Sequence, residues 1–157
     1  MQEYEDLANM RKLNMSDEEF LINHFFFFIP HHGIMQHGKI RVVFNGPSRA
    51  LNGISLNDTL HSGPTLQTDI IFILMRWRCF KYAFKTDIQK MYRQILIHPD
   101  DRKFQCIIWG DNAENYSAYE LSTVTYGLGP SAYQAIACLH QLSDLESENH
   151  KSFYQNW

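Results

Sequence analysis

Residues 82–95 read YAFKTDIQKMYRQI, and this stretch decides the fold that we expect. Its first half, 82–88, is mainly apolar and has the length of a strand, so it predicts a β-strand. Asp87 stands at the carboxyl end of that strand, where a carboxylate gains nothing from core packing. A buried carboxylate is costly unless it is paired or bound to a metal. Asp87 therefore either lies at an edge, pairs with Lys85 or Lys90, or binds Mg²⁺.

Other strands and helices are expected on both sides of this stretch. Short apolar or β-branched runs predict strands at 25–29, 39–45, 94–98, 104–109 and 116–123. Helical spacing of apolar residues predicts helices at 3–13, 64–78 and 130–145, and a capping-box pattern predicts a helical turn from Ser16. The link Gly110-Asp111-Asn112 predicts a β-hairpin, and Pro99-Asp100-Asp101 predicts a turn. Mixed elements with antiparallel pairing predict the α+β fold class.

The composition is that of an ordinary globular protein. Of the 157 residues, 45% are hydrophobic and 20% are charged, which excludes a disordered or collagen-like chain. No apolar run reaches the ~20 residues that span a bilayer. The acidic N-terminus lacks a signal pattern, and three widely spaced cysteines predict reduced thiols. We therefore expect an intracellular protein, cytoplasmic or nuclear, that does not associate with a membrane.

The charges are distributed unevenly along the chain. Residues 1–30 carry a net charge of −4, residues 31–103 carry +6 and residues 104–157 carry −5, which together give −3. A basic central block in an acidic chain indicates either an anionic partner such as nucleic acid or a solvated basic surface.

Two segments resemble motifs of reverse transcriptases. Residues 85–95, KTDIQKMYRQI, resemble motif A of the enzymes of LTR retrotransposons, and residues 39–45, KIRVVFN, resemble their fingers motif. The resemblance is strongest to the Pao/BEL type, which has similar segments in the same order at 30–33, 53–58, 63–64 and 126–128. It extends from near residue 1 to about residue 142.

The resemblance implies a partial fingers–palm fold, with an antiparallel sheet and packed helices. An N-terminal helix and a fingers-like segment would occupy 1–81, a partial palm with motifs A and B would occupy 82–145, and a tail would occupy 146–157. We expect the strand that carries Asp87 to lie beside the 104–123 hairpin. We also expect Arg41, Asp87, Tyr92 and Gly127 to converge on one cleft.

The resemblance also implies roles for individual residues in template-directed nucleotidyl transfer. Asp87 would be catalytic and would bind Mg²⁺ together with the backbone carbonyl of Ile88. The implied nucleotide-binding residues are Lys39, Arg41, Tyr92, Tyr126, Gly127 and Gln134. Among them, Arg41 and Lys39 would hold the triphosphate, and the Tyr92 ring would exclude a 2′-hydroxyl. The alternatives are simpler. Lys39 and Arg41 would be solvated surface bases, Tyr92 would be a core aromatic residue, and Tyr126 and Gly127 would form an ordinary glycine turn before a helix.

The sequence departs from the family pattern at three places. Gln36 stands where a lysine is expected, Pro130 comes early in motif B, and the Tyr-x-Asp-Asp motif does not occur within residues 1–157. We therefore expect a truncated RNA-directed DNA polymerase domain that is inactive alone. Its partners would be a template–primer nucleic acid and a deoxynucleoside triphosphate, with Mg²⁺ as cofactor. The alternative is a non-catalytic remnant that binds nucleic acid or a protein.

Overall fold

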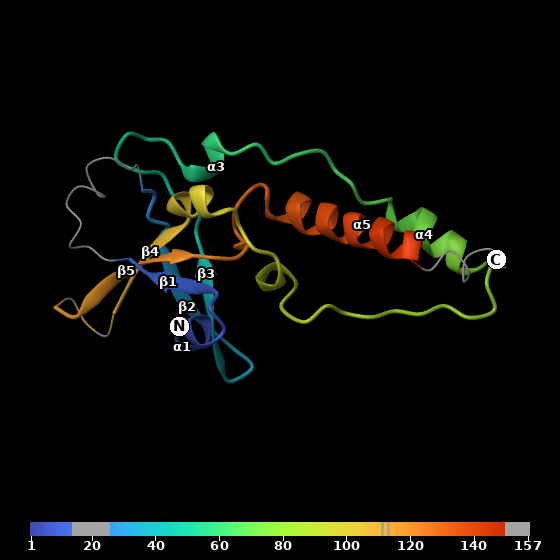
Figure 1. Cartoon of the computed structure of the whole chain (residues 1–157), viewed down its shortest axis with the longest axis horizontal. Coiled ribbons are helices and arrows are strands. Elements are labelled where there is room, and N and C mark those ends of the chain that lie inside the picture. The colour runs from blue at the N-terminus through green and yellow to red at the C-terminus, as the bar shows by residue number, and fades with distance from the viewer. Residues whose placement is uncertain (14–25, 111, 113, 150–157) are drawn as a thin grey trace.

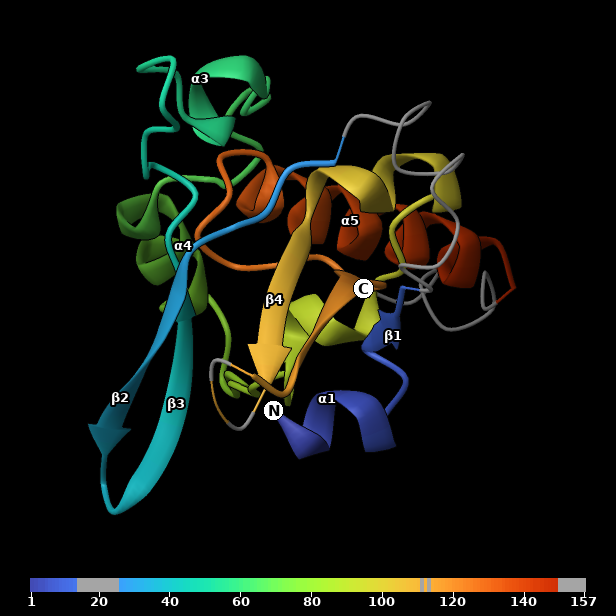
Figure 2. The same cartoon turned by 90° about the vertical axis from the view of Figure 1, so that its left-hand side faces the viewer.

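The computed structural model describes residues 1–13, 26–110, 112 and 114–149, and two antiparallel sheets lie at one end of it (Figure 1). The larger sheet has the strand order β1-β5-β4, formed by Met10–Lys12, Tyr116–Leu121 and Cys106–Gly110. The smaller sheet pairs β2 (His31–Gln36) with β3 (Lys39–Phe44) and extends away from the larger one (Figure 2).

Helices account for the rest of the regular structure in the described residues. The α-helices are α1 (Gln2–Asp6), α3 (Leu56–Thr59), α4 (Ile70–Trp77) and α5 (Ser131–Asn149). Two 3₁₀ helices are η1 (Met91–Gln94) and η2 (Pro99–Phe104). Helices α4 and α5 extend away from the sheets toward the other end of the molecule (Figure 1). The mixture of helices and antiparallel strands agrees with the predicted α+β class.

The predicted 104–123 hairpin and the predicted 39–45 strand are both present. Strands β4 and β5 pair from Cys106↔Glu120 to Gly110↔Tyr116. The β2–β3 turn places His37 and Gly38 at φ 50° and 73°, which is the conformation that two-residue hairpin turns favour. Strand β2 is not predicted, because its residues, HHGIMQ, show no clear alternation of apolar and polar side chains. Its strand conformation depends on hydrogen bonding to β3.

The hydrophobic core lies where the larger sheet meets α1, β3 and α3. Its buried members are Tyr4, Met10, Ile29, Phe44, Leu56, Ile107, Tyr119 and Leu121. The predicted strand at 25–29 is reduced to one parallel bridge, Phe28↔Cys106, and residue 25 lies outside the described residues. Ile29 is nevertheless fully buried, and its N–H donates to the Cys106 carbonyl at 2.7 Å. This segment therefore packs along β4 without becoming a regular strand.

The prediction of a strand at 82–88 beside the hairpin is wrong. These residues have no regular secondary structure and are exposed, with Phe84 at 89% of its full accessibility. A strand is stable only when a neighbour accepts and donates its backbone hydrogen bonds. Within the described part of the chain no segment pairs with 82–88. This mainly apolar segment therefore remains without a strand partner among the described residues.

Three other predicted elements are shorter than expected. The predicted helix at 3–13 ends at Asp6, because 10–12 form β1 on β5. The predicted helix at 64–78 begins only at Ile70, where the Asp69 side chain accepts the Ile71 N–H at 2.9 Å. The predicted strand at 94–98 is reduced to the bridge Leu96↔Thr123.

The remaining local predictions have different outcomes. The turn at 99–101 is the start of η2, and the helix at 130–145 is present as α5. The helical turn expected from Ser16 lies outside the described residues.

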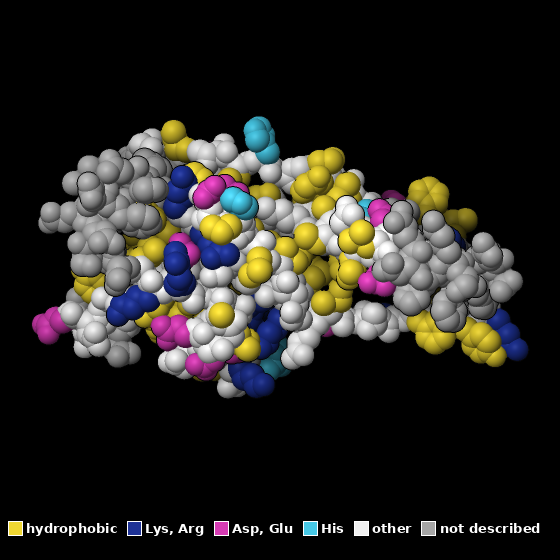
Figure 3. Space-filling model, in the orientation of Figure 1, with side chains coloured by type: hydrophobic (Ala, Val, Ile, Leu, Met, Phe, Trp, Pro, Cys, Tyr) yellow, Lys and Arg dark blue, Asp and Glu magenta, His cyan; other side chains and the backbone are white. Residues whose placement is uncertain are grey.

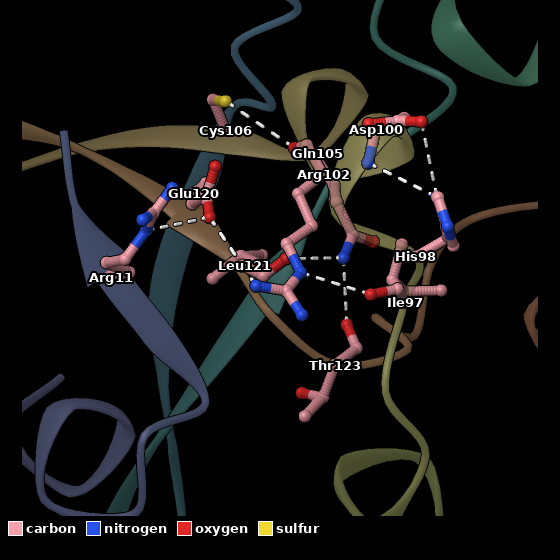
Figure 4. A network of polar contacts seen from close by, with 10 residues as sticks. All are labelled: Arg11, Ile97, His98, Asp100, Arg102, Gln105, Cys106, Glu120, Leu121 and Thr123. Carbon is pink, nitrogen blue, oxygen red and sulfur yellow. Dashed lines mark hydrogen bonds and ion pairs between the residues drawn. The ribbon is translucent and has the colours of Figure 1, made fainter.

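A buried polar network ties β1, β5 and η2 together (Figure 4). The Gln105 side-chain amide donates to the Leu121 carbonyl at 2.7 Å and to the Thr123 carbonyl at 2.9 Å. The Glu120 carboxylate, only 6% exposed, accepts from Arg11 Nε at 3.0 Å and lies 3.7 Å from Arg102 Nη1. Because each cation reaches the same oxygen, the buried carboxylate is paired from both sides.

Apolar side chains are exposed on α4. Five residues of this helix are 49–65% exposed: Ile70, Ile71, Phe72, Leu74 and Met75. Figure 3 shows hydrophobic side chains on the surface at the end of the molecule where α4 lies. Among the described residues, no helix is both long and apolar enough to cross a membrane.

Candidate functional site

A cleft of about 620 Å³ is formed by four segments that are far apart in the sequence. Its lining residues are Met1, Glu3 and Tyr4 near α1, Gln36, His37, Lys39, Ile40, Arg41 and Val42 of the β2–β3 hairpin, Ile88, Lys90, Met91, Tyr92 and Arg93 around η1, and Tyr126. Four of the lining side chains are lysine or arginine, and one is a carboxylate. This excess of positive charge attracts anions.

Aromatic rings support the wall of the cleft beneath the cations. The Phe44 ring makes edge-to-face contacts with Tyr4 at 6.1 Å and with Tyr126 at 5.4 Å between centroids. The Tyr126 hydroxyl donates to the Val42 carbonyl, which fixes this side chain against β3. Burial raises the pKa of Tyr4 far above its usual value, and a hydrogen bond with Tyr126 adds to the shift, so Tyr4 stays neutral. Ring contacts and this hydrogen bond therefore link Tyr4, Phe44 and Tyr126 into one wall.

Arg41 lies on this aromatic wall. Its guanidinium carbon is 5.6 Å from the centre of the Tyr126 ring, and its Nη1 donates to Gln36 Oε1 at 3.4 Å. The planar face contacts the ring while other N–H groups of this exposed side chain remain available. Arg41 is thus oriented by its neighbours without being neutralised by a carboxylate among the described residues.

Lys90 and Arg93 approach the cleft from η1. Lys90 precedes the helix in a left-handed conformation, with φ 54° and ψ 37°, and its Nζ donates to Glu3 Oε1. Arg93 Nη1 lies 3.7 Å from Glu3 Oε2, and its guanidinium carbon is 4.7 Å from the centre of the Tyr4 ring. The hydrogen bond from Lys90 lowers the pKa of Glu3 below its ordinary value, which favours the ionised carboxylate.

Five of the eight residues implied by the resemblance belong to the cleft lining. They are Lys39, Arg41, Ile88, Tyr92 and Tyr126. Of the four residues that we expect to converge there, Arg41 and Tyr92 line the cleft. Asp87 and Gly127 do not, although each is adjacent in sequence to a lining residue. Gln134 lines a different cavity, of about 430 Å³, together with Leu56 and His98.

Gly127 packs directly behind the cleft wall. Its φ is 92°, a conformation that residues with a side chain rarely adopt. A Cβ at this position would overlap the carbonyl oxygen of Phe44. Glycine is thus required for the close contact between the 126–127 turn and β3, which brings Tyr126 onto the cleft.

Asp87 is exposed and makes no ion pair or hydrogen bond with another described residue. Lys90, one of its two expected partners, pairs with Glu3 instead. The described residues contain no group of three His, Cys, Asp or Glu side chains that could hold a metal ion. Because Mg²⁺ is usually held by one or two carboxylates together with substrate phosphates, we assign no reaction step to the ion.

Ten of the lining residues were not among the predicted site residues, and they include Glu3, Tyr4, Lys90 and Arg93. Lys90 and Arg93 lie inside the motif A-like segment, so their charge was a usable signal. Glu3 offered no local signal, because its contact with Lys90 spans 87 residues of sequence.

No protein-family model matches the chain, and comparison with curated proteins finds no significant similarity. The function is therefore inferred from the motif-like segments of the sequence and from the geometry of the cleft.

Proposed function

We propose that the chain is the fingers and the first part of the palm of an RNA-directed DNA polymerase, a reverse transcriptase of the Pao/BEL retrotransposon type. In this proposal the cleft binds the phosphates of a template–primer nucleic acid and of a deoxynucleoside triphosphate. One observation carries it. The fingers-like residues Lys39 and Arg41 line the same cleft as Ile88 and Tyr92 of the motif A-like segment, although the two segments are far apart in sequence.

The chemistry of the cleft supports phosphate binding. A guanidinium can make two parallel hydrogen bonds to a phosphate. Arg41 is oriented by Tyr126 and Gln36, and its other N–H groups remain available for such bonds. Lys39 adds a second, exposed charge on the same strand. Tyr92 contributes a half-buried ring at the side of the cleft that η1 forms. The proposal assigns Mg²⁺ only to Asp87 and the Ile88 carbonyl, as the resemblance implies.

Binding of a labelled RNA–DNA template–primer tests the proposal. Fluorescence anisotropy with the 157-residue chain should show binding that weakens steeply as salt rises from about 50 to 200 mM, because phosphate contacts release counterions. Arg41→Ala should weaken binding about tenfold, the loss typical of one charge-assisted contact. The matched control is Arg76→Ala, which removes the same charge from the exposed last turn of α4, outside the cleft.

Two outcomes would contradict the proposal. One is the absence of any salt-dependent binding by the folded chain. The other is an equal loss of affinity in Arg41→Ala and Arg76→Ala, which would mean that the duplex responds only to net charge.

A second candidate function is protein binding by a non-catalytic remnant. The exposed apolar residues of α4 favour it, because large exposed apolar patches often mark contacts between proteins. Phe72→Ser, on the exposed face of α4, tests whether this helix takes part in template–primer binding. It should leave template–primer binding unchanged if the cleft is the functional surface.

A further inference from the structure

The Glu3 carboxylate bridges two cations in the cleft. Its Oε1 accepts from Lys90 Nζ, and its Oε2 lies 3.7 Å from Arg93 Nη1. One anionic group with two oxygens on two separate cations has the arrangement that a bound phosphate would adopt. Glu3 comes from α1, and Lys90 and Arg93 come from η1, so the pair forms only in the folded chain.

The backbone is strained where these cations enter the cleft. Three non-glycine residues in the described part of the chain have positive φ: Ala8, His37 and Lys90. His37 and Lys90 both line this cleft, but the φ of His37 is the one that its hairpin turn favours, so the strain concerns Lys90. Strained backbone tends to be retained where it positions a functional group. The left-handed conformation at Lys90 places its side chain against Glu3 at the start of η1.

Glu3 does not satisfy Arg93 completely. Arg93 Nη1 is shielded from solvent and has no hydrogen-bond partner among the described residues. Its 3.7 Å separation from Glu3 Oε2 is too long for a hydrogen bond. An unpaired buried donor is unfavourable, so a larger anion that reached both cations would use a donor that Glu3 leaves free.

We propose that Lys90 and Arg93 form a phosphate-binding subsite and that the Glu3 carboxylate occupies it when no phosphate is bound. A phosphate group, from a triphosphate or from a nucleic-acid backbone, displaces Glu3 when it binds. Glu3 is 56% exposed, and exposed ion pairs are weak, so a multiply charged anion competes with it effectively. The inference rests on the proposed function in that both place phosphate in this cleft. The subsite and its competitor are additional to it.

Glu3→Gln tests the inference, with Glu5→Gln as the matched control. Both residues lie on α1 and both substitutions remove one negative charge, but Glu5 is outside the cleft lining. The probes are inorganic tripolyphosphate and a labelled single-stranded oligothymidine, measured by calorimetry and by anisotropy. We expect Glu3→Gln to tighten binding about fivefold more than Glu5→Gln does. A larger effect on tripolyphosphate assigns the subsite to a nucleotide, and a larger effect on the oligonucleotide assigns it to the strand.

A second pair of variants guards against an indirect effect through folding. In a Lys90→Gln background, Glu3→Gln should no longer tighten binding, because one half of the subsite is absent. Circular dichroism and thermal unfolding verify that each variant is folded.

The outcomes separate the inference from the proposed function. Equal tightening by Glu3→Gln and Glu5→Gln overturns the subsite and leaves the Arg41 test of the cleft unaffected. Persistence of the Glu3→Gln effect in the Lys90→Gln background also overturns it. Failure of Arg41→Ala to weaken template–primer binding overturns the proposed function instead, whatever Glu3→Gln does to tripolyphosphate.

Discussion

The buried side chain of Gln105, which precedes β4, holds the end of β5 in place. Its amide donates to the carbonyls of Leu121 and Thr123, where β5 leaves the sheet. Gln105→Leu keeps the approximate volume but leaves both carbonyls without this donor, which should lower the free energy of unfolding by about 2–3 kcal/mol. Urea denaturation measures the change. Gln67→Leu, at an exposed position, is the control, and equal midpoints in the two variants would contradict the prediction.

A comparison of Gly127 with Gly53 tests how much close packing against β3 contributes to stability. Both have positive φ, 92° and 79°, but a Cβ would overlap Phe44 at Gly127 and would meet nothing within 4 Å at Gly53. Gly53→Ala should therefore cost only the conformational penalty of about 1–2 kcal/mol. Gly127→Ala should cost at least about 2 kcal/mol more, because the β3 contact must open. Thermal unfolding of the two variants checks this, and similar melting temperatures would show that the turn yields easily.

Glu3 should make stability depend on pH. The hydrogen bond from Lys90 lowers the pKa of Glu3 below its ordinary value of 4.5. A carboxylate whose pKa is lower in the folded state stabilises the protein at pH values above its ordinary pKa. This contribution is lost as the pH falls through the folded-state pKa. Melting temperatures between about pH 7 and pH 3 should therefore fall less in Glu3→Gln than in the original chain. Asp58, whose pKa is lowered by its hydrogen bonds with Ser55, continues to contribute in both proteins.

At the scale of elements, the unpaired segment 82–88 is the most accessible part of the chain between α4 and η1. Within the described residues it belongs to no sheet, and Tyr82 and Phe84 are 69% and 89% exposed. Limited trypsin digestion should therefore cut first after Lys81 or Lys85. Arg11 on β1 and Arg102 in η2 are held by Glu120, so cleavage there should follow only later. Early cleavage after Arg11 or Arg102, with 82–88 intact, would contradict this order.

Element prediction from the sequence succeeded where local pattern and tertiary pairing agree. Strand β3, the β4–β5 hairpin and α5 all have their partner or their helical period within a short stretch of sequence. The prediction of a strand at 82–88 failed because a mainly apolar run indicates only that a strand can form, and a neighbouring strand is needed to stabilise it. In the same way, β1 was mistaken for helix because its partner β5 lies far along the chain. Part of the candidate cleft was predictable from motifs, whereas Glu3 and Tyr4 required the fold.

At the scale of the whole molecule, the 157-residue chain should not extend a primer. Polymerases of the proposed type hold two metal ions between carboxylates, and the Tyr-x-Asp-Asp motif does not occur within residues 1–157. Loss of one main electrostatic element commonly costs 10²–10³-fold, so incorporation should stay at background. The measurement is primer extension on a polyribonucleotide template with Mg²⁺ or Mn²⁺. Incorporation that disappears in Asp87→Asn would refute the prediction and would mean that another carboxylate completes the site.

The pairing of β1 with β5 also determines the order in which the chain can acquire its structure. Met10 pairs with Leu121, so the larger sheet cannot close while the ribosome is still adding the residues between them. The β2–β3 and β4–β5 hairpins join near neighbours and can form as they emerge, because closing a short loop loses little entropy. Helix α1, which leads into β1, must wait for the C-terminal half. The cleft is therefore completed last, by Met1, Glu3 and Tyr4, which are synthesised before its other lining residues.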